Sequence, residues 1–186
     1  FGASMSQAQS GTTVEAFHFP AFHSFAPAYT KQPVKSTLQK QTALWCDLTL
    51  DYCRHYNVLW LDIVKATNCS LFVNPSIARR MRGEDVAYFL GALVERGDAI
   101  WDASRSRCLV FWRRPEEWGD IIYRWIEATG NNGSLMTVYE LRLSETTRNE
   151  PFHALDLEMM LLALSALEST GKAALFSGEK SDSVGV

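Results

Sequence analysis

Apolar residues recur at helical spacing in two segments that resemble each other. Residues 84–101 (EDVAYFLGALVERGDAIW) and residues 157–176 (LEMMLLALSALESTGKAALF) align when Gly97 is placed over Gly171. Each segment predicts an amphipathic helix that is closed by glycine and followed by a short apolar strand. The pattern therefore predicts a structural unit that occurs twice in the chain.

A second pair of predicted helices precedes these segments. Residues 41–57 and residues 117–130 each carry an apolar stripe at helical spacing. A capping-box pattern at 36–39 predicts the start of the first helix, and Pro115, followed by two acids, predicts the start of the second. Residues 99–101 and 108–112 predict a β-hairpin.

The order helix, short middle segment, helix and hairpin occurs twice, and this order is typical of a winged helix. We therefore predict a mainly α fold with small β-hairpins (α+β), made of two tandem winged-helix domains at 36–114 and 115–186. Since almost no linker separates them, we expect them to pack as a rigid rod. Residues 1–16 are small and polar, which predicts a disordered N-terminal extension.

Residues 17–35 predict an extended arm that is rich in proline and aromatic residues. Proline fixes φ and disfavours helix before it, so the aromatic rings would project as anchors for a partner. The alternative interpretation is an arm that folds back and covers the core of its own first domain. The residues concerned are Phe19, Pro20, Phe22, Phe25, Pro27 and Tyr29.

The chemistry of the chain favours neither an enzyme nor a nucleic-acid-binding protein. Its 186 residues have a formal net charge of −3, and four cysteines and four histidines lack metal-ligand spacing. We find no catalytic motif, and expect no enzyme activity, no metal and no cofactor. No apolar run reaches the ~20 residues of a membrane span. The predicted third helices are acidic, which argues against a nucleic-acid-binding winged-helix regulator, the alternative function.

Two further features leave alternatives open. Arg79, Arg80 and Arg82 form a basic cluster, which is either a solvated patch or a contact for a partner or for acidic lipid. The segment 157–167 is apolar except for Glu158 and Ser165. Such a helix is either buried on several sides or leaves one side for a partner helix.

Several longer motifs resemble a known family. They are LWC…CR at 44–54, WRRPEEWG at 112–119, VYEL at 138–141 and FHALD at 152–156, behind an arm that ends in YTKQP. This pattern resembles the smallest subunit of the ESCRT-II endosomal sorting complex. The resemblance extends from about Phe17 to Val186.

The resemblance implies a non-catalytic adaptor. Two copies would assemble with one copy each of two larger ESCRT-II subunits, and the arm would dock through the six residues named above, although alanine follows Pro20 and Pro27 here. The second domain would recruit an ESCRT-III subunit, start filament assembly and so sort ubiquitinated membrane proteins into multivesicular bodies. Its candidate contacts are Leu135, Met136 and Thr137. The implied location is the cytoplasm, with recruitment to endosomes and a second pool in the nucleus.

Overall fold

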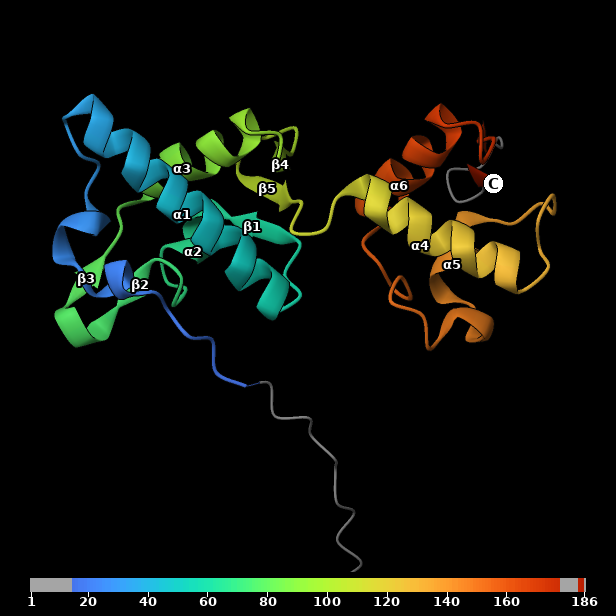
Figure 1. Ribbon diagram of the computed structural model, residues 1–186, viewed down its shortest axis with the longest axis horizontal. Helices are drawn as coiled ribbons and strands as arrows, with labels where there is room; N and C mark the ends of the chain where they lie inside the picture. Colours follow the sequence, from blue (N-terminus) through green and yellow to red (C-terminus); the bar gives the residue numbers. More distant parts are fainter. Residues whose placement is uncertain (1–14, 178–183, 186) are drawn as a thin grey trace, which may run out of the picture.

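The computed structural model describes residues 15–177 and 184–185, so nearly all of the predicted extension at 1–16 lies outside the described residues. Figure 1 shows two lobes that follow each other along the longest axis of the molecule. Both lobes are mainly helical and carry short antiparallel strands. The predicted α+β class is confirmed, and the order of elements is consistent with the predicted winged helices.

The first lobe is built around the longest helix, α1, and a small sheet. In this sheet β5 lies between β1 and β4, and both pairings are antiparallel. The predicted hairpin is therefore confirmed as β4 and β5. In chain order the elements are α1 (Lys35–His55), β1 (Trp60–Asp62), α2 (Ile63–Ala66), β2 (Val73–Asn74), η3 (Pro75–Ile77), β3 (Arg79–Arg80), α3 (Gly83–Glu95), β4 (Ala99–Trp101) and β5 (Arg107–Val110).

The predicted capping box at 36–39 is wrong. Helix α1 already begins at Lys35, and its N-cap, Val34, makes no side-chain hydrogen bond. Instead, Gln41, in the second turn of the helix, accepts a bond from the backbone N–H of Gln32 at 3.1 Å and donates to the Thr30 carbonyl at 2.9 Å. The entry to α1 is thus fixed by tertiary contacts with the preceding segment.

The second lobe repeats the helical part of the plan. Its elements are α4 (Pro115–Ala128), α5 (Val138–Leu143), η4 (Glu145–Thr147), α6 (Leu157–Ser169), β6 (Phe176–Ser177) and β7 (Val184–Gly185). Gly97 after α3 and Gly171 after α6 adopt φ values of 77° and 71°, which suit glycine at a helix end. The strand after Gly171, however, begins only at Phe176, further from its glycine than β4 is from Gly97.

Helices α4 and α6 pack closely, and Gly119 of α4 lies directly against the α6 backbone. A Cβ atom at Gly119 would lie 3.0 Å from the Ala163 carbonyl oxygen and 3.2 Å from Leu167 Cγ. Ala163 and Leu167 are buried, and Leu161 on another side of α6 is half-buried against the core. The apolar character of α6 is therefore explained largely by burial within its own lobe.

The junction between the lobes contains a compact group of large side chains. The Trp112 and Trp118 rings meet edge to face at 5.8 Å, and the Arg113 guanidinium lies 4.4 Å from the centre of the Trp118 ring. Arg114, at the start of α4, pairs with the buried Asp98 of the first lobe at 3.0 Å. These contacts favour a rod, although its rigidity stays a prediction.

Candidate partner-binding surfaces

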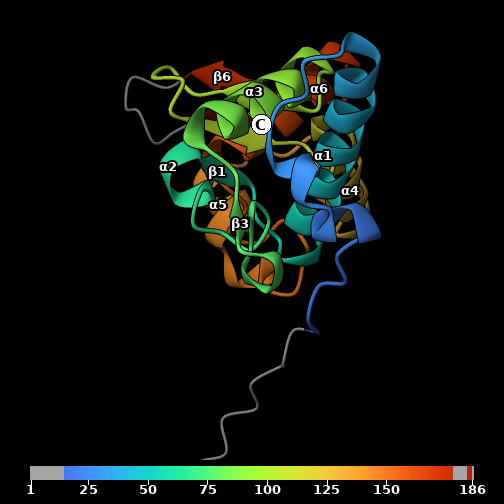
Figure 2. The same cartoon turned by 90° about the vertical axis from the view of Figure 1, so that its left-hand side faces the viewer.

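The arm is folded onto the first lobe, and the prediction of an extended arm is wrong. It forms two short 3-10 turns, η1 (Ala21–Ser24) and η2 (Ala26–Tyr29), which lie beside α1 (Figure 2). Pro20 precedes η1 as its N-cap, and Pro27 lies in the first turn of η2. Proline is tolerated in both places, because the first turn of a helix needs no N–H donor and fits its fixed φ.

Tyr29, predicted as a partner anchor, is part of the chain's own core. Only 3% of the residue is exposed, and its hydroxyl donates to the His23 carbonyl at 2.9 Å. Burial raises the pKa of Tyr29 to about 12. For this ring the alternative interpretation, an arm that covers its own domain, is the one that the structure supports.

Trp45 of α1 explains why the arm folds back. Its indole N–H donates to the Ala28 carbonyl at 2.9 Å, and its ring meets Phe22 at 5.3 Å and Tyr29 at 5.4 Å, both edge to face. Gln41 also donates to the Ala28 carbonyl, at 2.8 Å. These long-range partners satisfy the backbone of η2, and the sequence pattern gave no signal for them.

His23 is the functional candidate that sequence reasoning missed. It is 3% exposed, and its ring stacks on Phe19 at a centroid distance of 4.0 Å. Its Nε2 lies 3.2 Å from the Ser70 carbonyl and 3.1 Å from the Leu71 carbonyl. A single histidine between aromatic residues has no distinctive pattern, and only the fold reveals its position.

Part of the arm remains available to a partner. Phe25, between the two turns, is 60% exposed, and Pro20 and Pro27 are exposed as well. Phe19 and Phe22 are half-buried against the first lobe. Of the six predicted anchors, Phe25 is thus the ring that extends furthest into solvent, and it is framed by two prolines.

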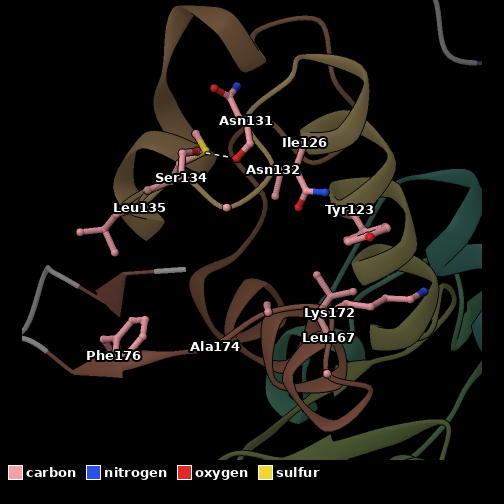
Figure 3. A pocket seen from close by; sticks show the side chains of 14 residues that line it. Tyr123, Ile126, Asn131, Asn132, Ser134, Leu135, Leu167, Lys172, Ala174 and Phe176 are labelled. Carbon is pink, nitrogen blue, oxygen red and sulfur yellow. Dashed lines mark hydrogen bonds between the residues drawn. The ribbon is translucent and has the colours of Figure 1, made fainter.

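The second candidate surface is a cleft of about 550 Å³ in the second lobe (Figure 3). Leu135 and Met136, two of the predicted contacts, line it, and Leu135 is 76% exposed. Phe176, 60% exposed, faces the cleft from β6. The remaining lining residues are Tyr123, Ile126, Asn131, Asn132, Gly133, Ser134, Leu167, Gly171, Lys172, Ala173 and Ala174.

One end of this cleft carries a cation. The Lys172 ammonium pairs with the Asp120 carboxylate at 3.2 Å and lies 5.1 Å from the centre of the Tyr123 ring. A hydrogen bond with the Glu127 side chain and the negative charge of Glu127 raise the pKa of Tyr123. The Tyr123 hydroxyl therefore stays protonated near neutral pH. The cleft therefore combines apolar and polar lining residues, and one end carries the Lys172–Asp120 ion pair.

Thr137, the third predicted contact in this segment, has a role within the chain. Its hydroxyl accepts a bond from the Glu140 backbone N–H at 3.1 Å, and the Glu140 carboxylate accepts from the Thr137 N–H at 2.7 Å. This reciprocal capping box starts α5, and hydrogen bonds from Thr137 lower the pKa of Glu140. A direct contact of Thr137 with a partner stays a prediction.

The basic cluster of Arg79, Arg80 and Arg82 lies beside the acidic start of α3. Arg79 and Arg80 are exposed on β3, whereas Arg82 pairs with Glu84 at 2.9 Å and with Asp85 at 3.5 Å. Both acids lie in the first turn of α3, where the helix dipole favours a negative charge. A helix that begins with two carboxylates is poorly suited to contact phosphates.

Over residues 15–177 and 184–185, no cluster of three or more histidine, cysteine or acidic side chains is placed to hold a metal ion. Within the same part of the chain, no helix has the length and apolar character that crossing a bilayer requires.

Comparisons with known proteins find similarity over most of the chain. A family model described as ESCRT-II complex subunit matches residues 22–156. Vacuolar protein-sorting-associated protein 25 of Danio rerio is 40% identical over 163 residues, which cover 87% of this chain and 94% of that protein. The Arabidopsis thaliana protein of the same name is 35% identical over 171 residues, 91% of this chain and 94% of that one.

Solved structures show the same fold. The crystal structure of subunit VPS25 of the endosomal trafficking complex ESCRT-II matches with a TM-score of 0.76 at 23% identity, over 89% of this chain and 96% of that chain. A chain in the crystal structure of endosomal complex ESCRT-II (VPS22/VPS25/VPS36) matches with a TM-score of 0.73 at 25% identity, over 89% and 96% of the two chains.

Proposed function

The chain belongs to the VPS25 family of ESCRT-II complex subunits, and from this premise we propose that it is a non-catalytic adaptor with two partner-binding surfaces. The observation that carries the proposal is the presence of an exposed aromatic ring on the arm and an open apolar cleft in the other lobe. Two separate surfaces of this kind suit a protein that connects other proteins. Its expected place of action is the cytoplasmic face of endosomes.

The arm and the first lobe would assemble with the two larger ESCRT-II subunits, with two copies of this chain in each complex. The similarity to a chain in the crystal structure of endosomal complex ESCRT-II (VPS22/VPS25/VPS36) supports partners of this kind. In this chain, Phe25 with its flanking prolines is the arm feature best placed for a first contact. Aromatic rings are frequent hot spots of protein interfaces, because they bury a large area at a small entropic cost.

The second lobe would bind a helix of an ESCRT-III subunit in the cleft. Leu135 and Phe176 give exposed apolar contacts, and these suit the apolar face of an amphipathic helix. At one end, an acidic residue of the partner could share the Lys172 ammonium with Asp120. Recruitment through this cleft would start filament assembly and the sorting of ubiquitinated membrane proteins into multivesicular bodies.

Substitution of Phe25 by alanine tests the first surface. We expect Phe25→Ala to weaken binding to the two larger subunits by about thirtyfold or more, since a hot-spot ring contributes about 2 kcal/mol or more. The matched control is Val64→Ala, because Val64 is 75% exposed on α2 of the same lobe. Binding is measured by size-exclusion chromatography with light scattering and by calorimetry. Equal affinity of the two variants would contradict the arm proposal.

A second pair of variants tests the cleft. We expect Leu135→Ala combined with Phe176→Ala to abolish binding of an ESCRT-III subunit while assembly with the larger ESCRT-II subunits is retained. The control is Tyr139→Ala, since Tyr139 is 63% exposed in the second lobe and does not line the cleft. If the double variant binds the ESCRT-III subunit as well as the control does, the partner lies elsewhere on the molecule.

A further inference from the structure

We propose that His23 is a proton-sensitive latch, which holds the arm on the first lobe while its imidazole is neutral and weakens the docking of the arm when the imidazole takes up a second proton. This inference rests on the proposed function, since it concerns the regulation of the same arm. It is independent of the identity of the partner, because the latch is closed by contacts within this chain.

The Nε2 side of the ring requires a proton. The two groups nearest to it are the carbonyl oxygens of Ser70 at 3.2 Å and Leu71 at 3.1 Å. Carbonyl oxygens only accept hydrogen bonds, so Nε2 is the donor. This bond joins η1 to the segment that precedes β2.

The Nδ1 side requires a lone pair. Nδ1 lies 3.3 Å from the side-chain amide nitrogen of Asn74, whose oxygen accepts bonds from the Ser76 N–H at 3.0 Å and the Ser76 hydroxyl at 2.6 Å. These two bonds fix the orientation of the Asn74 amide, and its NH₂ group also donates to the His23 carbonyl at 2.8 Å. A second proton on the ring would therefore place two donors against each other.

Among the described residues, the groups around His23 offer no counter-charge to an imidazolium. Burial lowers the pKa of His23, although its bonds to the two carbonyls act in the opposite direction. Arg79, a cation, lies opposite Asn74 in the β2–β3 pair. The titratable and charged groups that face His23, directly or through one neighbour, are Tyr29 of η2, Tyr52 of α1, Cys69 before β2 and Arg79 of β3.

The sign of the pH effect follows from this environment. An undocked arm has a histidine with an ordinary pKa of about 6.5, whereas the docked histidine has a lower pKa. The undocked state therefore binds more protons, and docking is fully favoured above pH 6.5 and weakens as the pH falls below it. At pH 5.5 the docking equilibrium can fall by at most about tenfold. Release would free Phe22 and Tyr29, the rings that now contact Trp45.

Hydrogen exchange of the isolated full chain tests the latch. The backbone amides of His23, Phe25 and Ala28 donate hydrogen bonds within the arm and report on its docking. Their protection factors are compared with those of α6 amides at pH 7.5 and at pH 5.5. Every exchange rate is corrected for the intrinsic rate of that amide at that pH. We expect relative arm protection to fall by up to about tenfold at pH 5.5. In His23→Gln the ratio should not change with pH, because glutamine donates to a carbonyl but does not titrate. The control His18→Gln, at an exposed position, should behave as the parent chain does.

A second measurement covers the case in which His23→Gln already has an undocked arm at pH 7.5. The ¹⁵N chemical shifts of the imidazole in the parent chain should show the Nε2–H tautomer and a pKa below 6.5. A His23 pKa of 6.5 or more, the other tautomer, or an unchanged protection ratio between the two pH values would overturn the latch. Each of these results is obtained without a partner, whereas the Phe25→Ala binding test judges the proposed function separately.

Discussion

Gly119 offers the sharpest test of the packing in the second lobe. The nearest groups to an added Cβ are the Ala163 carbonyl oxygen at 3.0 Å and Leu167 Cγ at 3.2 Å. The first is backbone of a well-packed helix and cannot move alone, so Gly119→Ala would force α4 and α6 apart. Overpacking of this kind costs about 1–3 kcal/mol.

The intrinsic helix propensity of alanine opposes this cost. An alanine in a helix interior is more favourable than glycine by about 1 kcal/mol. We therefore expect Gly119→Ala to lower the free energy of unfolding of the second lobe by about 1 kcal/mol. Gly91 of α3 is the matched control, because its added Cβ would meet only Trp101 Cζ2 at 4.0 Å. We expect Gly91→Ala to stabilise the first lobe by up to about 1 kcal/mol.

Native-state hydrogen exchange measures both effects, with α6 amides for Gly119→Ala and α3 amides for Gly91→Ala. The propensity gain is common to the two variants, so the difference between their free-energy changes isolates the steric cost of about 1–3 kcal/mol. If Gly119→Ala is as stabilising as Gly91→Ala, the close approach of α4 and α6 is not as described, and the reasoning fails.

Three other variants or probes test local contacts. Tyr29→Phe removes the hydroxyl that donates to the His23 carbonyl and should destabilise the docked arm by about 1 kcal/mol, seen as faster arm exchange at pH 7.5; unchanged exchange would show that the hydroxyl is dispensable. Thr137→Ala removes the cap that serves the Glu140 N–H and should lower the free energy of unfolding, measured in urea, by about 1 kcal/mol. Thr137→Ser keeps a hydroxyl at this position and should largely retain the stability of the parent chain. Burial raises the pKa of the Cys53 thiol, so an aromatic disulfide reagent at pH 8 should modify it only after unfolding, whereas the half-buried Cys69 is the thiol open to labelling in the native chain; fast modification at Cys53 itself, located by peptide mass spectrometry, would contradict its burial.

The four long helices α1, α3, α4 and α6 and the β4–β5 hairpin could be predicted because their signals are local. Helical spacing of apolar residues and a glycine with positive φ after each third helix lie within short windows of sequence. The same local signal predicted a strand directly after Gly171, because this segment matches the first copy in composition. In the structure the strand starts only at Phe176.

The state of the arm could not be predicted in the same way. Its prolines are compatible both with an extended chain and with the first turn of a 3-10 helix, so the local signal is ambiguous. Contacts with Trp45 and Gln41, which are distant in sequence, decide between the two. Leu135 and Met136, which the resemblance implies as candidate contacts, line the cleft, and their contact with a partner stays a prediction, whereas the contribution of Phe176 depends on the folded position of β6.

The two surfaces lie in different lobes, toward opposite ends of the molecule (Figure 1). A partner seated on the arm would therefore leave the far cleft unobstructed, and both ends could be occupied at once. The tryptophan-rich junction at 112–118 would then act as a spacer, whose length and stiffness set how far apart the two bound assemblies stand. Glycines inserted there would leave the affinity of each surface for its own partner unchanged. They would, however, make the distance between the two bound assemblies variable.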